Sequence, residues 1–386
     1  MSYRFVESKY KYNQSIINDS KSILFKYSTI KGRLSVLYSD YPMTVSKAHH
    51  NKDIIAIALG SAGSRIASRL SLMKTIIDKF YFISCDKQDL INNSESSLLI
   101  PLDYRGKNTP ANVRGAAIKF LPKIEEIINR SKIVFIISGL GGSVGSGLAT
   151  LVSDVIKKNN ATCLCIAAMP HSFESNKHFQ SAIALRRLNK SADAVIVVDN
   201  DDLSNDLVNN PILDTYEIIN EKIAFVIGKI LGLPQKGELH IDLSKLSRVV
   251  LQQGISVLGI GQTHINEAPE EAVSKAVRMI YDTVDPNETE NALFFLSGSK
   301  GITTGDIECS TKQIRSLLGD QSLNLEYGLS TNSNNSLTAI ILASGFNDTK
   351  FSKYDPIDTI LGKNNRIDDS SECEIELDLD KLSRLD

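Results

Sequence analysis

The sequence predicts an α/β fold: a doubly wound, mostly parallel sheet, a long central helix and a smaller C-terminal α+β domain. The first observation is a series of short apolar runs rich in Ile, Val and Phe, separated by stretches long enough for crossover helices. Runs that are apolar on both faces are typical of central parallel strands. The second observation is a proline-free, largely apolar helical pattern at 215–232, after the last of these runs.

The first half of the chain supplies the strands and their crossovers in order. We expect helices between the strands, for example at 110–130 and 147–159. Residues 1–50 are polar, rich in Tyr, Ser and Lys and without a sustained period. They predict an extension that is partly disordered, with one short helix near 16–27. The expected strands are 54–59, 80–84, 133–138, 163–169 and 194–198.

The second half begins with the central helix at 215–236. Its continuous apolar pattern covers 18 residues, a rod of about 27 Å, and predicts burial on most faces. A C-terminal α+β domain at 237–348 follows, with a helix at 267–284 and strands at 292–296 and 337–343. Residues 349–386 form a polar tail, in which acids alternate with Ile and Leu around 374–379. Two interpretations stay open: a segment that orders on binding a protein partner, or a solvated acidic tail.

Composition excludes several classes of protein. Among 386 residues, 43 Lys+Arg stand against 45 Asp+Glu, and this balance argues against nucleic acid as a partner. No apolar run reaches the roughly 18 residues that a membrane span needs, so we expect no membrane insertion. The N-terminus lacks the apolar segment of a signal peptide, which predicts a cytoplasmic protein. None of the five cysteines forms a CxxC motif, and Cys163 and Cys165 are expected to be reduced core residues.

Two glycine-rich loops carry most of the functional signal. The loop at 60–65 follows the first expected strand, and the loop at 139–147 follows the third, each just before a helix. Small residues let the backbone approach a ligand, and helix N-termini attract phosphate, so two such loops on one crevice predict a nucleotide di- or triphosphate site. The candidate residues are Gly60, Ser61, Ala62, Gly63 and Arg65 in the first loop, and Gly139, Gly141, Gly142, Ser143, Val144, Gly145, Ser146 and Gly147 in the second.

Other chemistries explain these loops less well. The P-loop pattern GxxxxGK[ST] is absent, and the first loop lacks a complete GxGxxG. Residues 141–145 match the GxSxG elbow, which would make Ser143 an acyl-transfer nucleophile. That hypothesis requires a later His as base, and it leaves the first loop and the long helix unexplained. The downstream candidates are His171, His178, His240 and His264.

The loops and several downstream segments together resemble the tubulin/FtsZ superfamily over about 53–348, with the FtsZ branch closer. GGSVGSG at 141–147 is similar to that family's GGGTGTG signature, and LASGF at 342–346 is similar to its ATGF end strand. The resemblance implies a GTPase domain at 51–214 that binds GTP or GDP. It also implies a ribose-binding role for Glu174 in an SFE loop, a nucleotide contact at Asn200, and guanine recognition by Tyr216 and Asn220. The last two stand one helical turn apart, so they share a helix face.

The same resemblance implies head-to-tail self-assembly into a filament. If Tyr216 stacks on the base, the loop at 237–245 lies about 25 Å away, at the other end of the helix. In FtsZ the matching stretch, NxDxxD, activates water at the nucleotide of the next subunit. One end completing the site of another is a heterologous contact, which repeats into a filament. The implied role is in cell division or cell shape.

This chain departs from the family pattern at several of these positions. HIDLSK keeps Asp242 as a catalytic candidate, but Lys245 replaces the second Asp and His240 replaces Asn. Lysine pairs with phosphate more readily than it activates water, so we expect hydrolysis to be slow or absent. A nucleotide-binding, non-hydrolysing paralogue that acts as a scaffold or regulator is therefore the alternative. Arg65 stands where Asn is usual, and His178, also a nucleotide-binding candidate, stands where Arg is usual.

Magnesium is expected to accompany the triphosphate without a direct protein ligand. Phosphate oxygens and water would hold Mg²⁺. Asp86, just after the second expected strand, stands where the family places a loop near the phosphates and would act through water.

Overall fold

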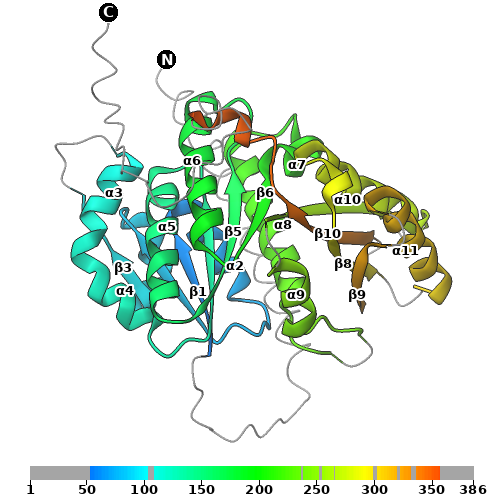
Figure 1. The fold of residues 1–386 in the computed structure, drawn as a ribbon, viewed down its shortest axis with the longest axis horizontal. Coiled ribbons are helices and arrows are strands. Elements are labelled where there is room, and N and C mark those ends of the chain that lie inside the picture. The colour runs from blue at the N-terminus through cyan, green and yellow to red at the C-terminus, as the bar shows by residue number, and fades with distance from the viewer. Residues whose placement is uncertain are drawn as a thin grey trace, which may run out of the picture. The chain divides into compact units, whose positions relative to one another are not determined.

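Ten strands pair into a single sheet in the computed structural model (Figure 1). Their order is β3-β2-β1-β4-β5-β6-β7-β10-β8-β9. Neighbours from β3 to β7 are parallel, and β10 alone runs against its neighbours β7 and β8. The strands are β1 (Ile54–Leu59), β2 (Lys79–Ser84), β3 (Ser97–Leu99), β4 (Ile133–Gly139), β5 (Thr162–Met169), β6 (Ala194–Asp199), β7 (Ile255–His264), β8 (Asn291–Gly298), β9 (Asn324–Thr331) and β10 (Ser336–Phe346).

The structure describes residues 53–102, 108–235, 238–251, 254–264, 266–298, 302–319, 322–331 and 336–356. The predicted N-terminal extension with its helix near 16–27, and the tail segment at 374–379, lie outside these residues. The five strands predicted in the first half and the two in the second are all present. The predicted α/β class is therefore confirmed.

Helices cover both faces of the sheet. α2, α8 and α9 pack on one face, together with Ala56 and Ala58 of β1. Helices α3, α4, α5, α6, α10 and α11 pack on the other face, together with Ile55 and Ile57 of the same strand. Their bounds are α2 (Gly60–Leu70), α3 (Pro110–Ala117), α4 (Leu121–Ile128), α5 (Ser143–Lys158), α6 (Ser175–Ser191), α8 (Ile212–Ile230), α9 (Leu243–Val250), α10 (Pro269–Thr283) and α11 (Thr304–Leu318), with the short α7 (Asn200–Ser204) after β6.

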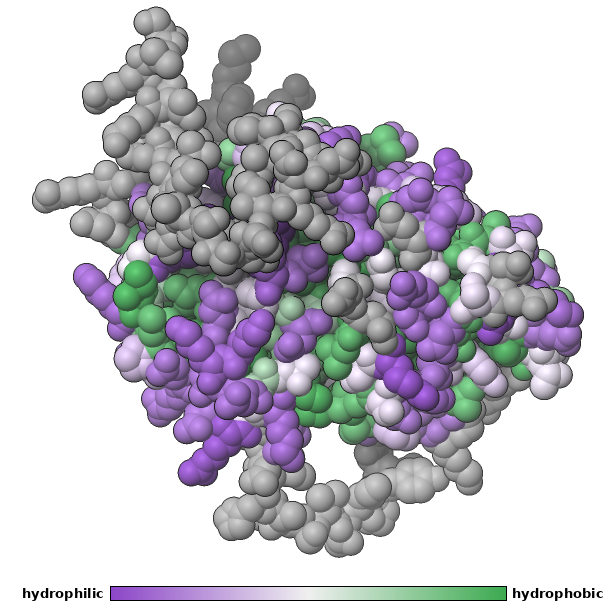
Figure 2. Space-filling view, in the orientation of Figure 1, coloured by the Kyte–Doolittle hydropathy of each residue, from purple (hydrophilic) through white to green (hydrophobic). Residues whose placement is uncertain are grey.

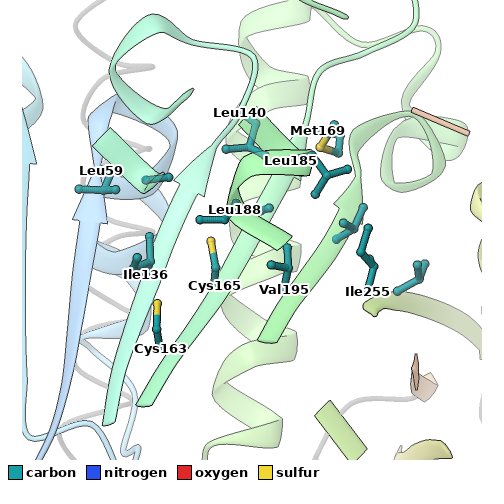
Figure 3. Close-up of a cluster of buried hydrophobic side chains, with 14 of the residues drawn as sticks. Leu59, Ile136, Leu140, Cys163, Cys165, Met169, Leu185, Leu188, Val195 and Ile255 are labelled. Carbon is teal, nitrogen blue, oxygen red and sulfur yellow. The ribbon is translucent and has the colours of Figure 1, made fainter. Parts of the chain in front are cut away.

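Alternate residues of each central strand enter the two cores, as parallel strands covered on both sides require. Figure 3 shows part of one core, where Cys163 and Cys165 of β5 lie among apolar side chains such as Leu188. Both cysteines are buried and unpaired, and burial raises the pKa of each thiol. The prediction that they are reduced core residues is confirmed.

Several expected boundaries were wrong for identifiable reasons. The single helix expected at 110–130 is two helices, α3 and α4, and Pro122 occupies the first turn of α4, where proline is favourable. The helix expected at 147–159 begins at Ser143. The sequence missed β7 because Gly259 and Gly261 interrupt its apolar pattern. A Cβ on Gly261 would stand 1.8 Å from the carbonyl oxygen of Ala272, so α10 lies directly on the strand there.

The predicted C-terminal domain does not have a sheet of its own, because the parallel pairing of β6 with β7 joins its strands to the first sheet. The predicted polar tail also begins with packed residues. Phe351 is 3% exposed, and the buried Asp355 forms an ion pair with Arg186 of α6 at 2.7 Å. The sequence missed this packing because the single apolar residue Phe351 stands among polar neighbours.

No helix among the described residues is long and apolar enough to cross a membrane. On the face drawn in Figure 2, hydrophilic residues gather over the region of α4 and α5, and apolar residues are scattered elsewhere.

Candidate functional site

Two glycine turns meet at the carboxyl ends of β1 and β4. The two strands are parallel neighbours, and Leu59 at the end of β1 pairs with Ser138 of β4. The chain moves from β1 to β2 on one side and returns to β4 on the other, so this edge is the topological switch point of the sheet. Open α/β sheets bind ligands at such points. The predicted convergence of the two glycine segments is confirmed.

Each glycine segment is shorter than predicted, because a helix begins inside it. Helix α2 begins at Gly60 itself, and α5 begins at Ser143, so residues 143–147 form the first turn of α5. The predicted second loop therefore ends at Gly142. This correction places two helix N-termini, with free N–H groups, at the same edge.

The two turns are packed against each other. Gly60 has φ +68°, a conformation that favours glycine, and its Cβ position lies 3.2 Å from the Val144 side chain. A Cβ on Gly139 would stand 2.9 Å from Ala62. Val144, which replaces a threonine in the resemblance, therefore joins the second turn to the first by an apolar contact.

Three of the candidate glycines are needed for backbone packing. A Cβ on Gly63 would stand 2.2 Å from the carbonyl oxygen of Ile137, and one on Gly145 would stand 2.1 Å from that of Gly139. Gly147 also lies close to α3, because its Cβ would stand 2.6 Å from the carbonyl oxygen of Pro110. These glycines shape the turns, and their roles as direct ligands stay predictions.

Gly142 differs from those three. A Cβ there would meet no described residue within 4 Å, so among these residues the space beside its backbone is open to a ligand. The Cβ position of Gly141 is bounded by Pro170 at 3.0 Å and by Lys177 at 3.3 Å. The exposed tip of the second turn thus has room for phosphate next to a lysine side chain.

The serine hydroxyls of the second turn are used within the protein. Ser143 donates to the backbone carbonyl of Asn108, and Ser146 donates to that of Leu140. Both bonds fix the shape of the turn. The Ser146 hydroxyl is buried and already engaged, and its role as a phosphate contact stays a prediction.

Arg65 faces helix α8 from the first turn. It pairs with Glu217 at 2.8 Å, and Arg69, one turn later, pairs with the same carboxylate and with Glu221. A polar cavity of about 530 Å³ adjoins this group, between α2, α8 and the segment after β2. Asp86 lines this cavity, and its predicted action on the phosphates through water stays a prediction. The cavity is lined by Ser61, Ser64, Arg65, Ser68, Arg69, Asp86, Gln88, Asp89 and Glu217.

Glu174 and Tyr216 meet beside the second turn. The Glu174 carboxylate accepts from the backbone N–H of His171 at 3.1 Å and forms an ion pair with Lys177. Although partial burial opposes it, hydrogen bonds from Lys177 and Tyr216 lower the pKa of Glu174. Burial and the same carboxylate raise the pKa of Tyr216. Glu174 and Tyr216 are 42 positions apart in the sequence, and both are predicted to touch the nucleoside. The structure brings them together.

His171 lies beneath this pair and was not predicted as part of the nucleotide site. Its ring is 1% exposed, stacks on Phe173 with centroids 4.9 Å apart, and meets the Tyr216 ring edge-on at 5.4 Å. Its Nδ1 contacts Asp201 at 3.1 Å. No sequence pattern links His171 to Asp201, because the contact depends on how β5 and β6 lie side by side.

The amide candidates lie at the same edge. Asn200 begins α7 directly after β6, and its buried Oδ1 has no hydrogen-bond partner in the described protein. An orphaned buried acceptor is costly unless a ligand donates to it, so this atom suits a base or ribose donor. Asn220 is buried on α8, one turn after Tyr216.

His178 is turned away from the second glycine turn. Its ring stacks on Tyr354 at 4.4 Å, and its Nε2 contacts the carbonyl oxygen of Ser172 at 3.0 Å. The structure thus gives no support to its predicted nucleotide contact. The sequence could not show this, because Tyr354 lies 176 positions later.

Asp242 and Lys245 stand at the start of α9, where the sequence predicted a loop. Asp242 is the N-cap, and its carboxylate accepts from the backbone N–H of Lys245 at 2.8 Å. This bond, followed by nearby positive charge, lowers the pKa of Asp242 despite a small opposing desolvation. From Tyr216 to Ile230, α8 spans about 21 Å, so this end lies far from Tyr216.

A doubly wound sheet with two glycine turns at its switch point is an arrangement that α/β nucleotide-binding proteins use. Residues 53–207 match the GTPase domain of the Tubulin/FtsZ family. The chain resembles this family as a divergent, FtsZ-like protein.

Named relatives agree with this assignment. Cell division protein FtsZ 1 of Thermococcus kodakarensis is 28% identical over 253 residues, which cover 64% of this chain and 68% of the relative. Cell division protein FtsZ 1 of Methanocaldococcus jannaschii is 25% identical over 301 residues, 76% of this chain and 82% of the relative. The GTPγS-bound protofilament of CetZ2 from Haloferax volcanii shares the fold, with a TM-score of 0.66 at 19% identity over 80% of this chain and 99% of CetZ2.

Proposed function

We propose that this chain binds GTP and GDP at the two glycine turns and assembles head to tail into cytoplasmic filaments that serve cell division or cell shape. Hydrolysis of GTP is slow or absent. The observation that carries the proposal is the pair of helix N-termini at neighbouring strand ends, with the open space at Gly142 between them and the nucleoside candidates Glu174 and Tyr216.

The bound nucleotide would run from the second turn to helix α8. Phosphates would meet the N–H groups of the two helix starts, ribose would meet Glu174, and guanine would stack on Tyr216 and pair with Asn220. Mg²⁺ would be held by phosphate oxygens and water.

Apolar side chains at both ends of α8 favour self-assembly. Near its N-terminus, Phe173, Val208 and Leu213 are exposed, Val208 to 83%. Beyond its C-terminus, Leu239, Leu251 and Tyr327 are at least 40% exposed. Exposed apolar groups gathered at two different ends suit a heterologous contact between copies of the chain. The names of the FtsZ relatives and of the CetZ2 protofilament support the same role.

The end near α9 is poorly equipped for hydrolysis. The Asp242 carboxylate is engaged in capping α9, and Lys245 brings a positive charge where the family has a second carboxylate. This observation favours the second candidate function, a non-hydrolysing scaffold or regulator of another polymer. The serine-hydrolase alternative gains no support, because the Ser143 hydroxyl donates to a backbone carbonyl and His171 faces Asp201.

Sedimentation with GTP, with GDP and without nucleotide tests the proposal. We expect pelleting with GTP and little phosphate release. Leu213→Glu should abolish pelleting without weakening GTP binding, whereas Ile118→Glu, an equally apolar exposed site between α3 and α4, should pellet normally. GTP binding without self-assembly would favour the scaffold, and absence of GTP binding would refute both.

A further inference from the structure

Lys177 belongs to the first turn of α6, and its side chain extends over the second glycine turn. Its Cδ is 3.3 Å from the Cβ position of Gly141, so its aliphatic stem runs over this glycine. Its ammonium group forms an ion pair with Glu174, and its side chain stays 41% exposed. The side chain therefore connects the ribose candidate Glu174 with the second glycine turn at Gly141.

Among the residues that the structure describes, three other basic side chains near the nucleotide edge are directed elsewhere. His178, which stands where the family has an arginine, is buried and stacks on Tyr354. Arg65 and Arg69 face the carboxylates of α8. A triphosphate at the second turn would therefore lack the counter-charge that the family pattern supplies at position 178.

We propose that Lys177 supplies this charge and is a phosphate-binding residue of this chain. The inference rests on the proposed binding of GTP. The Glu174–Lys177 pair holds a carboxylate and an ammonium side by side, at the place where a nucleotide presents ribose hydroxyls next to its phosphates.

The energetics allow the exchange of partners. The Lys177 side chain is 41% exposed, although Glu174 is only 12% exposed, so water can solvate the ammonium group while it turns from the carboxylate toward phosphate. Lysine is a compact point charge that binds phosphate without the fixed geometry that arginine requires. Glu174 keeps its other contacts with Tyr216 and the His171 N–H when the ammonium leaves.

The test compares ligands with and without phosphates. Affinities of GTP and guanosine are measured by competition against a fluorescent guanine nucleotide, for the full chain and for three variants. Lys177→Ala should weaken GTP about tenfold and guanosine less than twofold, because only GTP carries the phosphates. Lys177→Arg should restore most of the GTP affinity. Glu174→Gln should weaken both ligands by a similar factor, because both carry the ribose.

Lys157→Ala is the matched control for charge. This residue is exposed in the last turn of α5, away from the glycine turn, and its loss should leave both affinities unchanged. Thermal melting of each variant checks the fold. Equal weakening of GTP and guanosine by Lys177→Ala, or unchanged GTP affinity, would overturn the assignment while the proposed function stands. Failure of the unaltered chain to bind either ligand would overturn both.

Discussion

The two ends of helix α8 differ in how much of the family's chemistry they keep. At the N-terminal end, the glycine turns, Glu174, Tyr216 and Asn220 are in place, and the substitution at 144 makes an apolar contact that closes one turn on the other. At the C-terminal end, Asp242 remains but serves as a helix cap. Its neighbour Lys245 has the opposite charge to the expected carboxylate.

This difference teaches that binding and turnover can diverge separately within one chain. A binding site needs backbone shape and a few placed polar groups, which packing protects at the switch point. Water activation needs an ionised carboxylate free to accept a proton, and a single substitution removes it. The predictions below test the two ends against each other, from the largest expected effect to the smallest.

Gly142→Val should abolish GTP binding, with at least a hundredfold loss of affinity, because the branched side chain would fill the open space beside the turn. The fold should survive, since nothing stands within 4 Å of the new Cβ. Gly115→Val on α3 has equally free surroundings and serves as the control. Nucleotide titration measures the effect, and unaltered affinity would remove the second turn from the site.

Asp202→Asn should make the stability of the folded chain less dependent on pH. Burial raises the pKa of Asp202 to about 7, with a contribution from Asp199 and a smaller one from Asp282, against the opposing charge of Lys350. The folded chain therefore holds a proton that the unfolded chain loses near pH 4, and stability falls as the pH rises from about 4 to 7.

The variant should accordingly be more stable than the parent at pH 8, by about 2–4 kcal/mol, and equal to it at pH 4. Urea unfolding at both pH values measures this. Glu126→Gln, exposed on α4, should show no such change. If the stability difference between variant and parent is the same at pH 4 and pH 8, the pKa of Asp202 is not raised in the folded chain.

Lys245→Asp should raise GTP turnover in assembled material about tenfold, because it restores a carboxylate at the end that is expected to meet the next nucleotide. Lys245→Ala removes the charge without adding a carboxylate and should gain less. Phosphate release at constant pelleted mass is the measurement. If neither variant gains, the other departures, His240 among them, limit the rate.

Asp242→Ala should lower the stability of the chain, because α9 loses its N-cap. Asp242→Ser keeps a capping oxygen and should recover most of that loss in chemical denaturation. It still lacks a carboxylate, so any residual turnover that depends on Asp242 should remain lost. Equal turnover in the Ser variant and the parent would show that Asp242 acts only as a cap.

Local patterns predicted most of the parallel sheet, since apolar runs such as 133–138 need no distant partner to be recognised. The glycine segments were also predicted, but the sequence did not show which glycines pack against the backbone and which face open space. Gly142 and Gly145 are three positions apart, yet one faces open space and the other lies against the Gly139 carbonyl. Only the closure of α5 on β4 distinguishes them.

The sequence by itself determined the α/β class, the two glycine turns and the carboxylate and aromatic side chains that accompany them, because these depend on residue type and on spacing within one strand or helix. Tertiary structure decided which cation stands at the turn, that His178 lies under Tyr354, and that Asp242 caps a helix. Those outcomes depend on contacts between segments far apart in the chain, and the side chain alone does not specify its distant neighbour.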